Sequence, residues 1–198
     1  MNKWEFSDTE RMLHLWIGKH YGDDPENNLE HVIEDKEKYG YKLADALSLK
    51  ETDDVLDLGS GPGYIARALA HKVRTLRCVD VSKSFLDLAK ETCKDLDNVS
   101  YTLCDGLSLE GVENNSIDMV CSTFVFIHLG HFETYAYLKE IHRVLRKGGR
   151  FYFNIKIDAD FDVDHFIQPL QLFWQFDNLN VQCCVEHRGT LRLVCPLV

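Results

Sequence analysis

Long apolar runs, paired cysteines and positive charge are all scarce in this chain of 198 residues. No stretch reaches eighteen apolar residues, so no transmembrane helix is expected, and the first residues lack the apolar core of a signal peptide. The seven cysteines are odd in number and form no C-x-x-C pair. This favours free thiols in a reducing compartment over disulfides or a metal site. We therefore expect a cytoplasmic protein without a bound metal.

Acidic residues dominate the charge. The 22 Lys and Arg residues face 32 Asp and Glu residues, which gives a formal net charge of −10. Binding to a phosphate backbone rests on clustered cations. The densest group, Arg143, Arg146, Lys147 and Arg150, stands at the end of a predicted helix, where cations complement the helix dipole. The composition therefore predicts neither a nucleic-acid nor a membrane partner, and the length fits one domain with one core.

Three glycines follow an apolar run near the middle of the first half. Residues 55–63 read Val-Leu-Asp-Leu-Gly-Ser-Gly-Pro-Gly, and a helix is predicted over 64–70. A glycine turn between strand and helix lets a ligand touch bare backbone at the carboxyl end of a parallel sheet. The next predicted strand, 76–79, is followed by Asp80. A carboxylate there is placed to accept both hydroxyls of a ribose.

The spacing of these glycines separates two cofactors. A dinucleotide site has the pattern G-x-G-x-x-G, whose last glycine lets the helix pack close to the strand. In the frame that begins at Gly59 and Gly61, Tyr64 occupies that last position, and the pattern present is D-x-G-x-G-x-G. A nicotinamide-dependent dehydrogenase is therefore disfavoured.

Strands and helices are predicted to alternate after a helical first quarter. Helices are expected over 9–21 and about 29–47, with a break at Gly40 left open, and a long helix over 131–147 is expected to end at Gly148-Gly149. Its predicted apolar face is Phe132, Tyr135, Leu138, Ile141, His142 and Leu145. The remaining predictions are strands over 55–58, 76–79, 99–104, 117–122 and 150–156, a helix over 164–175, and a hairpin formed by 181–186 and 191–197. Such alternation predicts a parallel sheet with right-handed crossovers.

The glycine turn resembles the first motif of class I S-adenosylmethionine-dependent methyltransferases. Four later segments resemble that family's landmarks in the same order: 78–82, 103–106, 117–129 and 144–150. The resemblance covers about residues 50–197. It implies an α/β fold, Rossmann-like, with a seven-stranded mostly parallel sheet, helices on both faces and a C-terminal antiparallel hairpin. It also implies a single methyltransferase domain over 1–198, with a helical lid or cap over 1–50 and a cofactor-binding core over 51–198.

The same resemblance implies S-adenosylmethionine as cofactor and assigns residues to it. Asp57 and Gly59 would hold the methionine end, and Gly61 would let the sulfonium approach. Asp80 would accept from the ribose, while Asp105 would meet the adenine amine. The full set of implied cofactor-binding residues is Asp57, Gly59, Gly61, Gly63, Asp80, Val81, Asp105, Gly106 and Ser122.

The acceptor is expected to be a small molecule. The Asn/Asp-Pro-Pro-Tyr segment of methyltransferases that act on adenine or glutamine is absent, and Ser122-Thr123-Phe124-Val125 stands in its place. His128 follows, and its ordinary pKa suits a general base for a hydroxyl acceptor. The alternative is that His128 shapes the loop or packs on the cofactor. Asp118 is expected to be a loop or edge carboxylate.

Three alternatives stay open. A non-catalytic S-adenosylmethionine-binding protein, regulatory or partner-activating, would carry the same motifs. Asp158, Asp160, Asp162 and Asp164 resemble a calcium loop but lack its glycine and its last acid, so a solvated loop with a helix cap is expected, with recognition of a cationic substrate as the other interpretation. The aromatics of the first segment form either core or a lid over the acceptor: Trp4, Phe6, Trp16, Tyr21, Tyr39 and Tyr41.

Overall fold

The computed structural model describes residues 25–156, 184–186 and 190–196. The helices predicted over 9–21 and 164–175, the four aspartates of 158–164 and the first four aromatics lie outside the described residues. The chain divides into two compact units. The first unit holds the described residues up to Asp53 together with Ser60–Leu103, and the second holds Asp54–Gly59 together with the described residues from Cys104 onward.

The first unit is a strand–helix–strand arrangement with two further helices. Its elements are α2 (Pro25–Ala46), α3 (Tyr64–Ala70), β2 (Thr75–Asp80), α4 (Lys83–Thr92) and β3 (Val99–Leu103). β2 and β3 pair in parallel, from Leu76 opposite Val99 to Asp80 opposite Leu103. α4 connects the two strands and contacts both, as a parallel pair requires. The apolar run that predicted β2 is buried, because Leu76, Cys78 and Val79 have no exposed surface.

Helix α2 runs without interruption through Gly40, so the break left open there does not occur. A Cβ on Gly40 would lie 2.7 Å from the Cβ of Ala68 and 2.9 Å from the carbonyl oxygen of Ile65. The glycine therefore marks a close approach of α2 to α3, since any larger residue would separate the two backbones.

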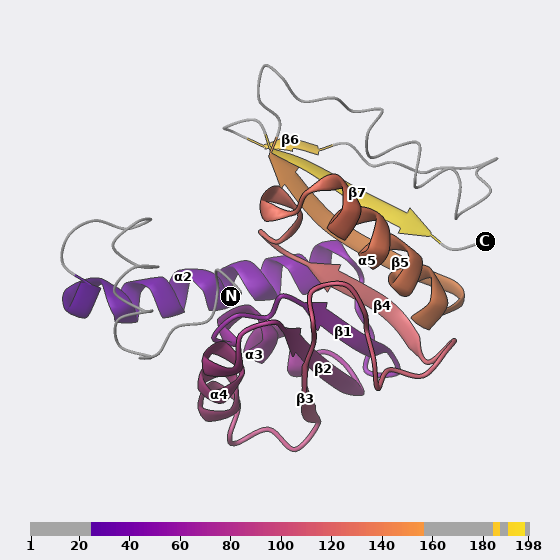
Figure 1. Ribbon diagram of the computed structural model, residues 1–198. Helices are drawn as coiled ribbons and strands as arrows, with labels where there is room; N and C mark the ends of the chain where they lie inside the picture. Colours follow the sequence, from indigo (N-terminus) through magenta and orange to yellow (C-terminus); the bar gives the residue numbers. More distant parts are fainter. Residues whose placement is uncertain (1–24, 157–183, 187–189, 197–198) are drawn as a thin grey trace. The chain divides into compact units, whose positions relative to one another are not determined.

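The second unit carries the remaining strands. Its elements are β1 (Asp54–Leu58), β4 (Ile117–Ser122), the 3₁₀ turn η1 (Phe126–His128), α5 (His131–Val144), β5 (Leu145–Lys156), β6 (Cys184–Glu186) and β7 (Thr190–Pro196). β1 pairs in parallel with β4, and β4 in parallel with β5. β7 runs antiparallel beside β5, as Figure 1 shows, and β6 pairs antiparallel with β7. Each of β1–β5 thus has a parallel partner, as the alternation of strands and helices predicted.

The prediction that the long helix continues to Lys147 is wrong. α5 ends at Val144, and Leu145 takes a ψ of 136° and pairs with Ile117. The physical reason is tertiary. The guanidinium of Arg146 donates to Asp118 on β4 and, over 2.8 Å, to Asp54 on β1, which holds this segment as a strand. The interpretation of Arg146 as a cation at a helix end is therefore also wrong.

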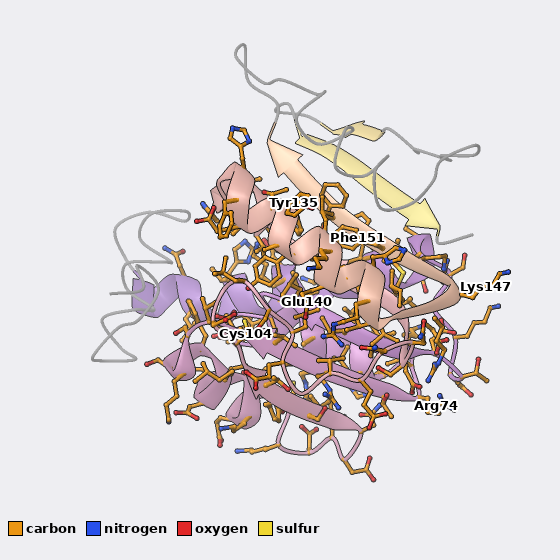
Figure 2. All side chains as sticks on the ribbon, turned by 45° about the vertical axis from the view of Figure 1, so that its right-hand side comes forward. Arg74, Cys104, Tyr135, Glu140, Lys147 and Phe151 are labelled. Atoms are coloured by element: carbon orange, nitrogen blue, oxygen red, sulfur yellow. The ribbon has the colours of Figure 1, made fainter. Side chains whose placement is uncertain are left out.

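The buried face of α5 is rotated from the predicted one. Phe132 and Tyr135 are 69% and 41% exposed, and Figure 2 shows Tyr135 on this helix. The buried residues have the i, i+3, i+4, i+7 spacing of one helical face: Thr134, Tyr137, Leu138, Ile141 and Val144. Phe132 and Tyr135, near the start of the helix, lie outside this buried face.

Two further findings concern the described residues alone. None of their helices is both long and apolar enough to cross a membrane. No group of three or more His, Cys, Asp or Glu residues among them is arranged to hold a metal ion.

Candidate functional site

The three glycines after β1 share a backbone conformation but differ in what surrounds them. Gly59, Gly61 and Gly63 have φ angles of +74°, +54° and +82°, which side chains rarely tolerate. A Cβ on Gly59 would meet Val125 at 2.2 Å, and one on Gly63 would meet Ala89 at 3.0 Å. A Cβ on Gly61 would meet nothing within 4 Å. Packing thus accounts for the outer two glycines, while Gly61 has the open space that a ligand needs.

Asp80 lies directly beside this turn. The backbone N–H of Gly61 donates to one carboxylate oxygen over 2.9 Å, and the N–H of Ser82 donates to the other over 2.9 Å. Asp80 is only 7% exposed. Burial raises the pKa of its carboxyl group, and the N–H groups of Ser82, Gly61 and Val81 oppose that rise. The two oxygens of the carboxylate have more lone pairs than these three N–H groups use, so the carboxylate can also accept from a ligand hydroxyl in a fixed orientation.

Helix α4 supports the turn at two points. Thr92, at the end of the helix, donates from its hydroxyl to the carbonyl oxygen of Pro62 over 2.8 Å. Ser82 caps its beginning by accepting from the N–H of Phe85. Val81, which was predicted to pack on adenine, is half-buried between Asp80 and this cap. The turn and Asp80 are therefore anchored to the same short helix.

Ser60 is a candidate that sequence reasoning missed. Its backbone is fully used in the turn, since its N–H donates to Val79 and its carbonyl oxygen accepts from Gly63. Its hydroxyl is buried and makes no hydrogen bond with any residue that the structure describes. A buried hydroxyl without a partner costs free energy that a ligand can recover. The sequence feature that could have identified Ser60 is its position between Gly59 and Gly61 in the turn.

In the second unit, Asp57 and Ser122 stand at the carboxyl ends of paired strands. Asp57 is 1% exposed and faces Cys121 in the register of β1 and β4. Burial, and next the nearby charge of Asp57, raise the pKa of the Cys121 thiol. The hydroxyl of Ser122 donates to the carbonyl oxygen of Leu58 over 3.0 Å. Ser122 therefore ties β4 to β1, and only its lone pairs are left for a ligand.

The segment after β4 is held in an unusual conformation. Phe124 has a φ of +62°, and its N–H donates to the side-chain oxygen of Asn154 over 2.6 Å. Asn154, on β5, is 1% exposed. His128 closes η1 by donating its backbone N–H to Val125 over 2.9 Å, and its side chain is exposed. The histidine proposed as a base is therefore accessible from solvent.

Asp105 and Gly106 form a tight turn after β3. One carboxylate oxygen of Asp105 accepts from the N–H groups of Leu107 and Ser108 and from the hydroxyl of Ser108. These bonds, that of Leu107 first, lower the pKa of the exposed carboxyl group. Any contact of Asp105 with an adenine amine therefore falls to its other oxygen.

Asp118 is not at the site. The expectation of a loop or edge carboxylate is wrong, because Asp118 lies on β4, which pairs with β1 on one side and β5 on the other. Its carboxylate accepts from the N–H of Asp54 over 2.9 Å and from Arg146. Of the residues predicted from the sequence, the first unit brings Gly61 and Asp80 into direct contact, and the second sets Asp57 and Ser122 at the ends of adjacent strands.

A family model described as a methyltransferase domain matches residues 56–153, which include the glycine turn, Asp80, Asp105 and His128. The chain belongs to the class I S-adenosylmethionine-dependent methyltransferases. This confirms the predicted family and the cofactor that defines it.

Relatives of this methyltransferase chain are longer than it is. Phosphoethanolamine N-methyltransferase 1 of Caenorhabditis elegans is 30% identical over 133 residues, covering 65% of this chain and 28% of that protein. Methyltransferase GfsG of Streptomyces halstedii is 30% identical over 136 residues, covering 66% of this chain and 48% of that protein. The chain thus spans about half or less of the curated relatives it matches.

A solved structure supports the fold of this methyltransferase. Phosphoethanolamine N-methyltransferase 1 of Haemonchus contortus, in complex with phosphoethanolamine and S-adenosylhomocysteine, aligns with a TM-score of 0.65 at 19% identity. The alignment covers 95% of this chain and 48% of that one. The likeness shows a Rossmann-like α/β methyltransferase fold with a parallel sheet, as the sequence predicted.

Proposed function

We propose that this chain binds S-adenosylmethionine through the turn of residues 59–63 and transfers its methyl group to a small molecule. The observation that carries the proposal is the hydrogen bond from Gly61 to Asp80, since it joins an open backbone position to a fixed, buried carboxylate. Residues 51–198 act as the cofactor-binding core and residues 1–50 as its helical cap.

Each residue of the first unit has a distinct task in this proposal. Asp80 accepts from the two ribose hydroxyls with its remaining lone pairs. Gly61 leaves room for the cofactor to approach the backbone. Ser60 gives its buried hydroxyl a partner only when the cofactor is bound. Val81 packs on the adenine, and Gly63 keeps α3 close to α4 so that the turn holds its shape.

The second unit supplies the remaining contacts. Asp57 and Gly59 face the methionine portion, and Ser122 offers a lone pair from the end of β4. Asp105 accepts from the adenine amine with the oxygen that does not cap its own turn, and Gly106, with a φ of +90°, allows that turn. These assignments follow the family's motif residue by residue.

When bound, S-adenosylmethionine supplies a methyl group on a positively charged sulfur. The chain's own residues then hold the acceptor in line with that methyl group and exclude water, which is where most of the rate gain of such a transfer arises. His128 accepts the proton if the acceptor is a hydroxyl, a task that its exposed position on η1 allows.

Calorimetry followed by a transfer assay tests the proposal. The purified protein should bind S-adenosylhomocysteine and give no heat with NAD; binding of NAD without S-adenosylhomocysteine would reject it. Protein and methyl-labelled S-adenosylmethionine are then incubated with a metabolite mixture, and label should appear in a small molecule. Cofactor binding without transfer would instead support a non-catalytic, regulatory role.

A further inference from the structure

Most of the exposed large apolar side chains among the described residues lie in the segment that follows β4. Among the described residues, large hydrophobic side chains are exposed at two positions in the β3 region, Leu103 and Leu107, and at four positions in the segment 124–135. The four are Phe124 at 40%, Ile127 at 37%, Phe132 at 69% and Tyr135 at 41%. Three of them are aromatic, and Phe132 and Tyr135 are one helical turn apart on α5.

This segment carries no fixed positive charge. The sequence has no Lys or Arg between Lys94 and Lys139. The ionisable side chains within 124–135 are His128, His131, Glu133 and Tyr135. Phosphate recognition uses Arg and Lys side chains or a helix N-terminus, and the N-terminus of α5 in this segment carries the carboxylate of Glu133 in its first turn, which repels an anion. The side chains here therefore favour an uncharged ligand over a phosphorylated one.

Phe124 is held outward by its backbone. A φ of +62° is rare for a bulky residue, and such outliers persist only where the surrounding structure fixes them. The fixing group is Asn154, whose buried side-chain oxygen accepts the N–H of Phe124 over 2.6 Å. This bond fixes the backbone of Phe124 at the residue where the unusual φ occurs, so Asn154 helps to hold the start of the segment in place.

The residues that follow Phe124 are also fixed. Val125 packs on Gly59 so closely that a Cβ there would lie 2.2 Å from it. Phe126 is buried against Phe153 and Phe151, with ring centroids 4.9 Å and 5.6 Å away. Phe126 thus occupies the buried position two residues after Phe124, while the side chain of Phe124 is 40% exposed.

We propose that the segment 124–135 binds an uncharged aromatic acceptor, that Phe124 contacts it, and that Asn154 is the positioning residue for Phe124. The proposal rests on the methyltransferase function proposed above and names its substrate class. Aromatic rings pair in stacked or edge-on geometries that add to the gain from burying their area. A ring held in one place loses less entropy on binding than a mobile one.

Binding of 2-naphthol to the protein saturated with S-adenosylhomocysteine tests this, with phosphoethanolamine as the charged comparison. Calorimetry should show binding of 2-naphthol and none of phosphoethanolamine. Phe124→Ala should weaken 2-naphthol by about fivefold and leave the affinity for S-adenosylhomocysteine unchanged. Leu103→Ala, which truncates an exposed apolar side chain outside the segment, is the matched control and should leave 2-naphthol binding unchanged.

Asn154→Ala should weaken 2-naphthol as much as Phe124→Ala does. The double variant should show no further loss, because both changes act through one ring. A purely structural role for Asn154 would instead lower the melting temperature and leave the affinity for 2-naphthol intact. If Asn154→Ala does not fold, Phe124→Gly provides the second test. Glycine adopts the positive φ without strain, so this variant should fold and weaken 2-naphthol binding as Phe124→Ala does.

Three results would overturn the proposal. One is tighter binding of phosphoethanolamine than of 2-naphthol. Another is an affinity for 2-naphthol that is the same in Phe124→Ala and in the parent protein. The third is a self-association in sedimentation that Phe132→Ala and Tyr135→Ala abolish, without 2-naphthol binding, since a second copy would then cover the segment. The titration is repeated without S-adenosylhomocysteine, so that failure of the cofactor to bind is scored against the proposed function and not against this surface.

Discussion

The backbone N–H of Gly61 donates to the carboxylate of Asp80 over 2.9 Å, across nineteen positions of sequence. Two motif features that the sequence presents separately are therefore one physical unit. Ser82 completes it by donating to the second oxygen. A change at Asp80 alters the turn itself as well as any ligand that binds there, which makes this pair the sharpest place to test the proposed function.

Asp80→Asn should weaken binding of S-adenosylhomocysteine by at least about tenfold, since hydrogen bonds to charged groups are worth about 1.5–3 kcal/mol. The amide offers an acceptor to only one of the two N–H groups and turns its own donor toward the other. Calorimetry measures the change, with Asp97→Asn, an exposed carboxylate of the same unit, as control. Unchanged affinity in a folded Asp80→Asn protein would remove Asp80 from the site.

The affinity for S-adenosylhomocysteine should fall as the solution becomes acidic. Burial raises the pKa of Asp80 above its ordinary 3.8, so the carboxylate that accepts from ribose is protonated at a higher pH than in the unfolded chain. The sign for stability is opposite. The folded state holds this proton more tightly, so the contribution of Asp80 to the free energy of unfolding is greatest below 3.8 and is lost as the pH rises through the folded-state pKa.

Titrations of S-adenosylhomocysteine at several pH values between about 4 and 7 measure this dependence. Asp80→Asn cannot ionise and should lack the acid-side loss. An equal acid-side loss in the variant would assign the titration to another group.

Ser60→Ala should leave the melting temperature of the ligand-free protein unchanged or raise it, because the hydroxyl removed has no partner among the described residues. The increase in melting temperature on adding S-adenosylhomocysteine should shrink, since stabilisation by a ligand follows its affinity. Ser122→Ala is the contrast. It removes a buried hydroxyl bonded to Leu58 and should cost about 1 kcal/mol of stability. A lower melting temperature for ligand-free Ser60→Ala would show that the hydroxyl serves the fold.

Arg146→Met should lower the free energy of unfolding by about 1–2 kcal/mol. Its guanidinium joins Asp54 to Asp118, whose side chains are 14% and 30% exposed, and the variant leaves these two carboxylates without it. Urea unfolding measures the change, and the affinity for S-adenosylhomocysteine should stay the same. Lys147→Met, the neighbouring exposed cation labelled in Figure 2, is the control and should have little effect. Equal stability of Arg146→Met and the parent would contradict the role assigned to the bridge.

Where the local pattern and the tertiary structure agree, the sequence was sufficient. β1 and β4 were predicted within a residue, because a buried parallel strand needs a continuous apolar run. The turn at Gly61 and Gly63 was predicted because both positions need a positive φ, which glycine adopts readily. Glycine was misleading at two other positions. Gly40 was considered as a helix break but permits a close contact between two helices, and Gly148 was predicted to end a helix but lies inside a strand.

The residues that escaped prediction depend on partners far away in sequence. The local sequence around Arg146 does not indicate that its guanidinium binds Asp54 and Asp118, which holds this segment as a strand. In the sequence Asn154 is an ordinary strand residue, and its role depends on the hydrogen bond that it accepts from Phe124, thirty positions earlier. Ser60 differs from any small turn residue only by the burial of its hydroxyl. Each of these properties is set by the assembled fold.

β1 ends in two different ways. At its start, Asp54 accepts a hydrogen bond from Arg146. Directly after its end, Gly59 packs against Val125, the residue that follows Phe124. Laboratory evolution toward heat tolerance can therefore work on the Asp54 end while selection for new acceptors works on the segment after β4. Substitutions in the two groups that do not contact one another should combine additively. Stability and the choice of acceptor thus depend on residues near opposite ends of the same strand, and each can be changed without the other.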